Sequence, residues 1–134
     1  TGAHMAAEAV AAGGAPVLCG PLLCDRSKPE LRELTPSNPG LLDRAGIPIA
    51  IITDHPVIPI QYLPLCAGLA VREGLDWERA VRAITLSPAE IAGIAHRVGS
   101  ITPGKDADLA LFSEDPLTLA AKPLAVIAGG KRIR

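Results

Sequence analysis

The stretch IAIITDHPVI, residues 49–58, joins an uninterrupted apolar run to an abrupt polar ending. A short apolar run bounded by polar residues and proline is typical of a strand that is buried on both faces of a parallel sheet. In open parallel sheets, ligands bind and catalytic residues lie at the carboxyl ends of the strands. Asp54 and His55 at this edge could therefore be a metal ligand and a proton carrier, or they could form a turn that stops the strand.

The composition of the 134 residues argues against two classes of partner. The net charge is −1, no basic run is present and 2% of the residues are aromatic, so we expect no nucleic acid partner. Prolines interrupt the longest apolar stretches, so we expect no membrane span, and residues 1–5 lack the pattern of a signal peptide. The apolar fraction of 49% and the mean hydropathy of +0.31 are nevertheless high. Part of the apolar surface is therefore expected to meet another surface.

The three cysteines, Cys19, Cys24 and Cys66, form an odd and irregularly spaced set. Cys19 and Cys24 have no second cysteine pair with which to build a zinc site. We expect reduced and mostly buried thiols in a cytoplasmic protein.

The first part of the chain alternates between strand and helix patterns. Strands are predicted at residues 15–20 and 47–53. Helices are predicted at 5–12, 39–45, 58–73, 77–84 and 88–95, with Asn38 and Asp76 as caps and Ser87 to Glu90 as a capping box. The alternation indicates two parallel strands joined by a crossover helix. Two strands cannot bury both faces of a sheet, so either partner strands come from another chain or this is a fragment.

Short β segments replace the helices after His96. Strands are predicted at 97–101, 108–112 and 123–127, and Gly129-Gly130 turns the last one into a hairpin with residues 131–134. The segment from Lys105 to Asp108 resembles paired carboxylates for acid–base work, but it follows Pro103-Gly104, which favours a hairpin turn. Trp77 and Tyr62 occupy helical positions and are expected in the core.

Four segments carry a resemblance to a known family. Residues 45–75, AGIPIAIITDHPVIPIQYLPLCAGLAVREGL, resemble the last barrel strand and helix of the amidohydrolase superfamily, close to its imidazolonepropionase-related branch. Residues 16–31, PVLCGPLLCDRSKPEL, are similar to the preceding strand and loop. Residues 78–117, ERAVRAITLSPAEIAGIAHRVGSITPGKDADLALFSEDPL, resemble the return into its small β-sandwich, and residues 125–133, AVIAGGKRI, resemble its closing hairpin.

This resemblance implies an α/β fold in two parts. Residues 1–95 are expected to be the C-terminal fragment of a (β/α)8 metal-dependent hydrolase barrel, containing its last strands and helices. Residues 96–134 are expected to be a small antiparallel β-sandwich segment.

The resemblance also implies a chemistry. Members of the superfamily use one or two divalent metals, and zinc is expected here, to activate water for the hydrolysis of C–N bonds. Asp54 matches the aspartate at the end of the last barrel strand, which touches the metal and takes a proton from the bound water. The other ligands of the superfamily, a His-x-His pair among them, have no counterpart in this chain, so the chain alone is expected to be inactive.

Three further side chains are predicted to bind substrate. His55 follows Asp54 directly, and Arg26 and Lys28 lie on a charged loop after the first predicted strand, where a cation could pair with a carboxylate. The alternative for that loop is a solvated charge run. The expected partner is a small-molecule substrate.

We also expect association, either as a homo-oligomer or with the missing half of a barrel, because the strand at 47–53 needs cover on both faces. The alternative function is a non-catalytic folded fragment, a self-associating scaffold that lacks the metal centre.

Overall fold

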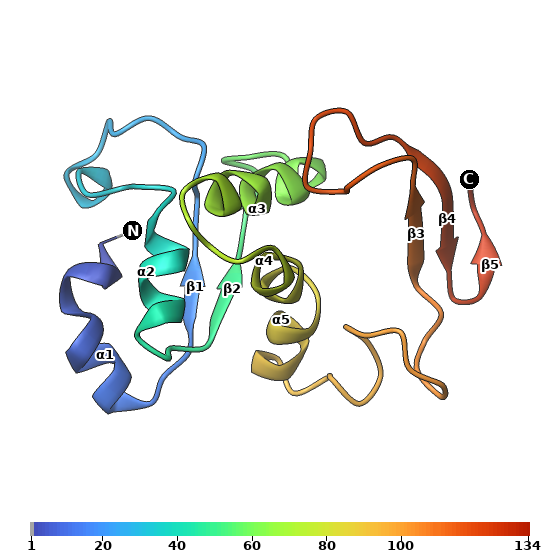
Figure 1. Cartoon of the computed structure of the whole chain (residues 1–134), viewed down its shortest axis with the longest axis horizontal. Helices are drawn as coiled ribbons and strands as arrows, with labels where there is room; N and C mark the ends of the chain where they lie inside the picture. The colour runs from blue at the N-terminus through green and yellow to red at the C-terminus, as the bar shows by residue number, and fades with distance from the viewer. Residues whose placement is uncertain (1) are drawn as a thin grey trace.

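The computed structural model describes residues 2–134 and shows a mixed α/β chain with two separate sheets (Figure 1). A two-stranded parallel sheet lies among the helices, whereas a three-stranded antiparallel sheet lies at the opposite end of the molecule from the N-terminal helix α1, Ala7–Gly13. None of the helices between residues 2 and 134 combines the length and the apolar character that crossing a bilayer requires.

The parallel sheet consists of β1, Val17–Cys19, and β2, Ile49–Ile51. The two strands are adjacent and parallel, with Leu18 opposite Ala50, which confirms the predicted pairing. α2, Asn38–Arg44, is the predicted crossover helix, and a proline in its first turn costs no helical hydrogen bond. Asn38 itself is not the cap that its sequence position suggests. It lies inside the helix, and its side-chain oxygen accepts a hydrogen bond from the His4 amide at 3.1 Å.

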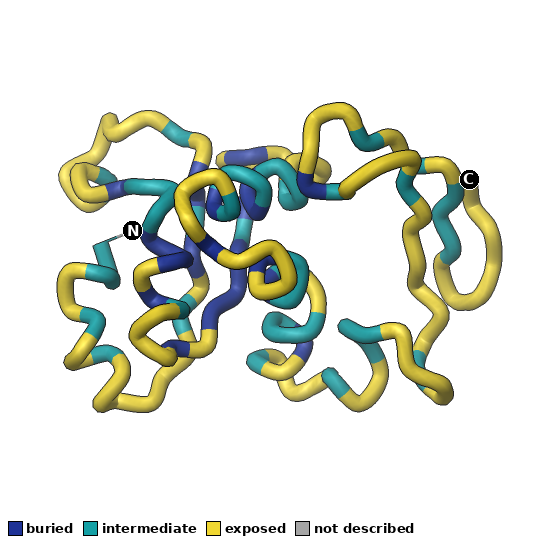
Figure 2. The backbone as a smooth tube through the Cα atoms, in the orientation of Figure 1, coloured by how far each residue is buried: buried dark blue, intermediate teal, exposed yellow. Residues whose placement is uncertain are grey.

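The core of the molecule surrounds β2. Ile49, Ala50 and Ile51 are 5%, 0% and 2% exposed. The strand contacts α2, α3 (Leu63–Arg72), α4 (Trp77–Ala83) and α5 (Leu86–Ile91). Figure 2 shows the buried residues gathered along the parallel strands and on the helix faces beside them. Because burial of an aliphatic side chain contributes about 1.5–3 kcal/mol, this region is the main source of hydrophobic stabilisation.

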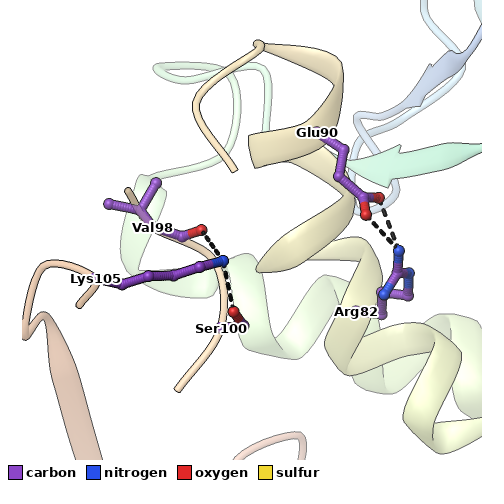
Figure 3. A network of polar contacts seen from close by, with 5 residues as sticks. All are labelled: Arg82, Glu90, Val98, Ser100 and Lys105. Atoms are coloured by element: carbon purple, nitrogen blue, oxygen red, sulfur yellow. Dashed lines mark hydrogen bonds and ion pairs between the residues drawn. The ribbon is translucent and has the colours of Figure 1, made fainter. Parts of the chain in front are cut away.

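Two of the predicted helix starts are wrong. α3 begins at Leu63 and not at residue 58, because Pro59 is extended and a single 3-10 turn, Ile60–Tyr62, precedes the helix. The capping box at Ser87 does not form, since Ser87 already lies inside α5. Its partner Glu90 instead accepts hydrogen bonds from Nη2 of Arg82 at 2.6 and 2.8 Å, which ties α5 to α4 (Figure 3).

The predicted cap of α4 is confirmed, whereas two predicted core positions are wrong. Asp76 caps α4 as predicted, because its side chain accepts a hydrogen bond from the backbone amide of Arg79. Trp77 and Tyr62 are 43% and 47% exposed, so the expectation of core positions is wrong for both. Tyr62 ends the 3-10 turn before α3 and Trp77 is the first residue of α4, so neither lies in the body of a helix.

The antiparallel sheet consists of β3, Leu109–Phe112, β4, Pro123–Ala128, and β5, Lys131–Arg132, in the order β3-β4-β5. The predicted strands at 108–112 and 123–127 and the closing hairpin are confirmed. In contrast to β2, three of the four residues of β3 are exposed.

No strand forms at residues 97–101, so that prediction is wrong. Gly99 has a φ of +90°, outside the extended region, and it packs so closely on α5 that an added Cβ would lie 2.8 Å from the Cβ of Ala89. The segment is held instead by Lys105, whose Nζ donates to Oγ of Ser100 at 2.7 Å and lies 3.4 Å from the carbonyl oxygen of Val98 (Figure 3).

The two carboxylates after Lys105 have structural partners. Asp106 forms an ion pair with Arg97 at 2.8 Å, and Oδ1 of Asp108 accepts a hydrogen bond from the amide of Gly129 at 2.7 Å. These contacts favour a structural role over acid–base work for the segment.

A bridging loop, residues 113–122, joins the antiparallel sheet to the helices. Leu117 in this loop is 6% exposed and belongs to the same core cluster as β2. The loop approaches α3 so closely that a Cβ on Gly68 would collide with the carbonyl oxygen of Leu117. The indole Nε1 of Trp77 donates to both carboxylate oxygens of Asp115 at 3.0 Å. The loop thus holds the antiparallel sheet against the helices that pack on β2, through the close approach of Leu117 to Gly68 and the hydrogen bonds between Trp77 and Asp115.

Candidate functional site

The candidate site lies where the two parallel strands end. The register of β1 and β2 brings their carboxyl ends side by side, and the amide of Ile52 donates to the carbonyl of Cys19 at 2.9 Å just beyond them. Gly20 follows β1 at this point, and any Cβ there would collide with the carbonyl oxygen of Ile52. Glycine is therefore needed for the two chain segments to continue in contact after the strands end.

Asp54 turns the chain away from β2. Its φ is +56°, a left-handed conformation that aspartate tolerates better than most residues. Its carbonyl accepts a hydrogen bond from the amide of Val57 at 2.9 Å, while Thr53 before it is buried. The Asp54 side chain is exposed and has no hydrogen bond or ion pair with any residue between 2 and 134. The turn at the strand end thus leaves a free carboxylate.

A hollow of about 520 Å³ opens at this edge; we call it the strand-end pocket. Its lining comes from the ends of both strands and from the charged loop after β1: Gly20, Pro21, Cys24, Asp25, Ser27, Lys28, Glu30, Leu31, Asp54 and Val57. Asp54 and Lys28, predicted from separate parts of the sequence, therefore line the same pocket. A carboxylate and an ammonium group are the two charged types that a polar substrate would meet there.

The other two predicted substrate-binding residues are placed differently. Arg26 does not line the pocket, because its Nη2 donates to the carbonyl of Leu34 at 2.7 Å and so anchors the far end of the same loop. His55 is exposed, does not line the pocket either, and has no side-chain hydrogen bond with the part of the chain that the structure describes.

Sequence reasoning missed four polar residues of the pocket: Cys24, Asp25, Ser27 and Glu30. The signal that was available is their position on the loop that directly follows an apolar strand, since such loops form the C-terminal edge of a parallel sheet. The prediction was limited to the basic side chains of the loop, so its acidic and small polar members were left out.

The buried thiols are unsuited to nucleophilic chemistry. Burial raises the pKa of Cys19 from 9.0 to about 12, and it also raises the pKa of Cys66. Both therefore remain protonated near neutral pH and behave as small apolar core residues. All three cysteines are free of disulfides.

The residues present do not make a complete metal centre. Between residues 2 and 134, no group of three His, Cys, Asp or Glu side chains lies close enough to hold a metal ion. Catalytic zinc sites in proteins ordinarily use three protein ligands. Asp54 is a suitable single donor, but the described chain alone does not fit the metal.

Comparison with known proteins extends this local picture to the whole chain. The sequence model of the Amidohydrolase family matches residues 2–133. Amidohydrolase tasK of Hapsidospora irregularis is 33% identical over 96 residues, which are 72% of this chain and 10% of that protein. The imidazolonepropionase of Geobacillus kaustophilus is 43% identical over 72 residues, 52% of this chain and 17% of that protein.

A solved structure shows the same arrangement of elements. An amidohydrolase from Thermotoga maritima MSB8 matches with a TM-score of 0.94 and 37% identity, over 98% of this chain and 34% of that chain. The chain therefore spans about a third of this structural relative and less than a fifth of the two curated ones. Because the family match extends over nearly every residue, the chain belongs to the amidohydrolase family.

Proposed function

We propose that this chain is the C-terminal portion of a metal-dependent amidohydrolase that hydrolyses the C–N bonds of amides or cyclic amides. In this proposal residues 1–95 are the last strands and helices of a (β/α)8 barrel, and residues 96–134 are part of a β-sandwich. The parallel pair with its crossover helix, followed by a separate antiparallel sheet, supports this division.

The observation that carries the proposal is the free carboxylate of Asp54 at the strand-end pocket. Asp54 lies at the carboxyl end of β2, is exposed, and makes no contact that would use its charge within residues 2–134. A general base must be free to accept a proton and must lie within reach of the reacting group. We assign Asp54 the roles of metal ligand and proton acceptor.

In this proposal, the remaining ligands of the metal come from outside the described residues. When bound, a divalent metal such as zinc supplies a water whose pKa is lowered toward neutrality. This chain holds the Asp54 carboxylate in a fixed position. The left-handed turn at Asp54 and the contact between Gly20 and Ile52 determine that position.

The substrate-binding roles divide among three side chains. Lys28 lines the pocket with Asp54, so we propose that it contacts a substrate directly. Arg26 would act through the loop that it anchors at Leu34. His55 adjoins Asp54 in sequence, and we keep it as a candidate for contact with the outer part of a small-molecule substrate.

The test is a chimera in which residues 2–133 replace the matching third of the Thermotoga maritima amidohydrolase. Asp54→Asn in this chimera should lower the hydrolysis of an amide and cyclic-amide panel by about a hundredfold or more, because the amide cannot accept the proton. The backbone should be unaffected, since asparagine also tolerates a left-handed conformation. Release of amine or ammonia measures turnover, and elemental analysis measures bound zinc.

Asp25→Asn is the matched control. It removes a second carboxylate from the same pocket, and its amide oxygen can still accept the 3.3 Å hydrogen bond from the Ser27 amide. Turnover should change little. Full activity and full zinc content in the Asp54→Asn chimera would refute the assignment.

A second candidate is a non-catalytic, self-associating scaffold. The observation in its favour is that residues 2–134 hold no cluster of three metal ligands while apolar strand surface stays exposed. We propose a homo-oligomer for the chain taken by itself, and a small molecule rather than nucleic acid or membrane as the ligand of the complete enzyme. The free thiols support a cytoplasmic location.

A further inference from the structure

We propose that Arg26 is a positioning residue. It fixes the loop that carries Lys28 into the strand-end pocket, and it thereby controls how tightly a substrate binds without touching the substrate. This role rests on the proposed function and deepens it, because it assigns the control of substrate affinity to a side chain outside the pocket.

One wall of the pocket comes from a single short segment of the chain. Residues 27–31 supply four of the ten lining residues: Ser27, Lys28, Glu30 and Leu31. The segment belongs to the loop between β1 and α2, which leaves the end of β1 and returns through one 3-10 turn, Pro29–Leu31 (Figure 1). Residues 25–30 are all exposed, so packing contributes little to the position of this wall. Its position therefore depends on hydrogen bonds.

Three hydrogen bonds close the segment into a ring. The amide of Leu31 donates to the carbonyl of Lys28 at 2.9 Å. The amide of Leu34 donates to the carbonyl of Leu31, also at 2.9 Å. Nη2 of Arg26 then donates to the carbonyl of Leu34 at 2.7 Å. The guanidinium thus joins the end of the segment back to its start, two residues before Lys28.

Leu34 is a suitable anchor for this ring. Its side chain is 5% exposed, whereas Arg26 and Lys28 are exposed. The hydrogen bond from the guanidinium is short and charge-assisted, and bonds of this kind are roughly twice as strong as those between neutral groups. Arg26 therefore holds the exposed part of the loop against a residue that packing keeps in place.

A wall that is ordered before the substrate arrives favours binding. Ordering a loop during binding subtracts from affinity, so a segment held by its own hydrogen bonds binds a ligand more tightly. The carboxylate of Asp54 is held separately, by the turn after β2. Loss of the Arg26 contact should therefore raise KM and leave kcat unchanged, the pattern expected when binding is lost equally in the ground state and the transition state.

Steady-state kinetics of the chimera described above tests this role. The panel includes amides that carry a carboxylate, because the ammonium of Lys28 pairs most strongly with an anion. Arg26→Ala should raise KM about tenfold, since one charge-assisted hydrogen bond is lost, and kcat should stay the same.

Arg32→Ala is the matched control. It removes another arginine from the same loop, whose side chain is 82% exposed, forms an ion pair with the adjacent Glu33 at 3.0 Å and does not line the pocket. KM and kcat should both keep their wild-type values. Thermal melts followed by circular dichroism confirm that every variant is folded.

A double-mutant cycle with Lys28→Ala shows whether Arg26 acts through Lys28. Once Lys28 has been replaced, Arg26→Ala should change KM little further, because the two side chains are coupled. An equal rise in KM in both backgrounds would mean that Arg26 contacts the substrate itself, and it would reject the positioning role. A lower kcat at unchanged KM would reject it as well.

Hydrogen exchange of residues 27–34 in the same chimera provides a measurement that needs no turnover. The amides of Leu31 and Leu34 should exchange about tenfold faster in Arg26→Ala than in the wild type or in Arg32→Ala, because the ring is open. Unchanged exchange would refute the ring. A chimera without turnover would refute the proposed hydrolysis, and exchange would still decide whether Arg26 fixes the loop.

Discussion

β2 and β3 have nearly the same local pattern, Ile-Ala-Ile and Leu-Ala-Leu, but opposite environments. Ile49, Ala50 and Ile51 in β2 are at most 5% exposed, whereas Leu111 in β3 is 61% exposed. The difference arises from cover, because four helices contact β2 while β3 borders an apolar hollow. An apolar run therefore determines that a strand forms, and the tertiary neighbours determine whether it is buried.

Removing the same atoms from each region should give very different losses of stability. Leu42→Ala, at a fully buried position on α2 beside β2, should lower the free energy of unfolding by about 3–5 kcal/mol. Leu111→Ala on β3 should change it by less than about 0.5 kcal/mol, because its side chain is already largely in water. Urea denaturation at low protein concentration measures both. Equal losses would mean that β3 is covered in solution.

The close contact between α3 and the bridging loop should be sensitive to a single methyl group. Gly68→Ala should cost about 1–3 kcal/mol, since the added Cβ collides with the carbonyl of Leu117 and backbone must move. The fluorescence of Trp77, the one tryptophan in the chain, should change as well, because its indole donates to Asp115 in the same loop.

Gly13→Ala is the control for this substitution. Gly13 lies at the end of α1 with no atom within 4 Å of an added Cβ, so alanine should be neutral or slightly stabilising. An unchanged melt and an unchanged Trp77 spectrum in Gly68→Ala would show that the bridging loop is not fixed to α3.

Because the Cys19 thiol in β1 is buried, the free energy of unfolding should depend on pH in the alkaline range. Burial raises the pKa of Cys19 from 9.0 to about 12, so between these values the unfolded chain releases a proton that the folded chain keeps. Stability should therefore be fully present below pH 9 and should fall above it, by about 1.4 kcal/mol per pH unit from this group.

The difference between wild type and Cys19→Ala isolates this contribution, because every other ionisable group is the same in both proteins. The wild type should lose stability more steeply than the variant between pH 9 and pH 12. Parallel slopes in wild type and Cys19→Ala would contradict the buried thiol.

The sequence predicted those features that depend on local pattern. The parallel pairing of β1 and β2, the crossover helix and the hairpin of β4 and β5 each follow from apolar runs, proline placement and Gly-Gly turns. The start of α3 and the loop at residues 97–101 could not be predicted, because they depend on Pro59 in its extended form and on packing against α5.

The candidate site was predictable in part for the same reason. Asp54 could be found because it directly ends an apolar strand, and Lys28 because it follows the neighbouring one. That Lys28 lines the pocket while Arg26 anchors the loop at Leu34 depends on how the loop folds back, which no spacing of residues indicates.

The left-handed backbone at Asp54 has a consequence for how the site changes over evolution. A φ of +56° restricts this position to a short set of residues, chiefly glycine, asparagine and aspartate. Asparagine and glycine codons each lie one nucleotide change from an aspartate codon, and neither residue strains the turn. A lineage can therefore lose the carboxylate in a single step without unfolding, so descendants that keep the scaffold but not this carboxylate are readily reached.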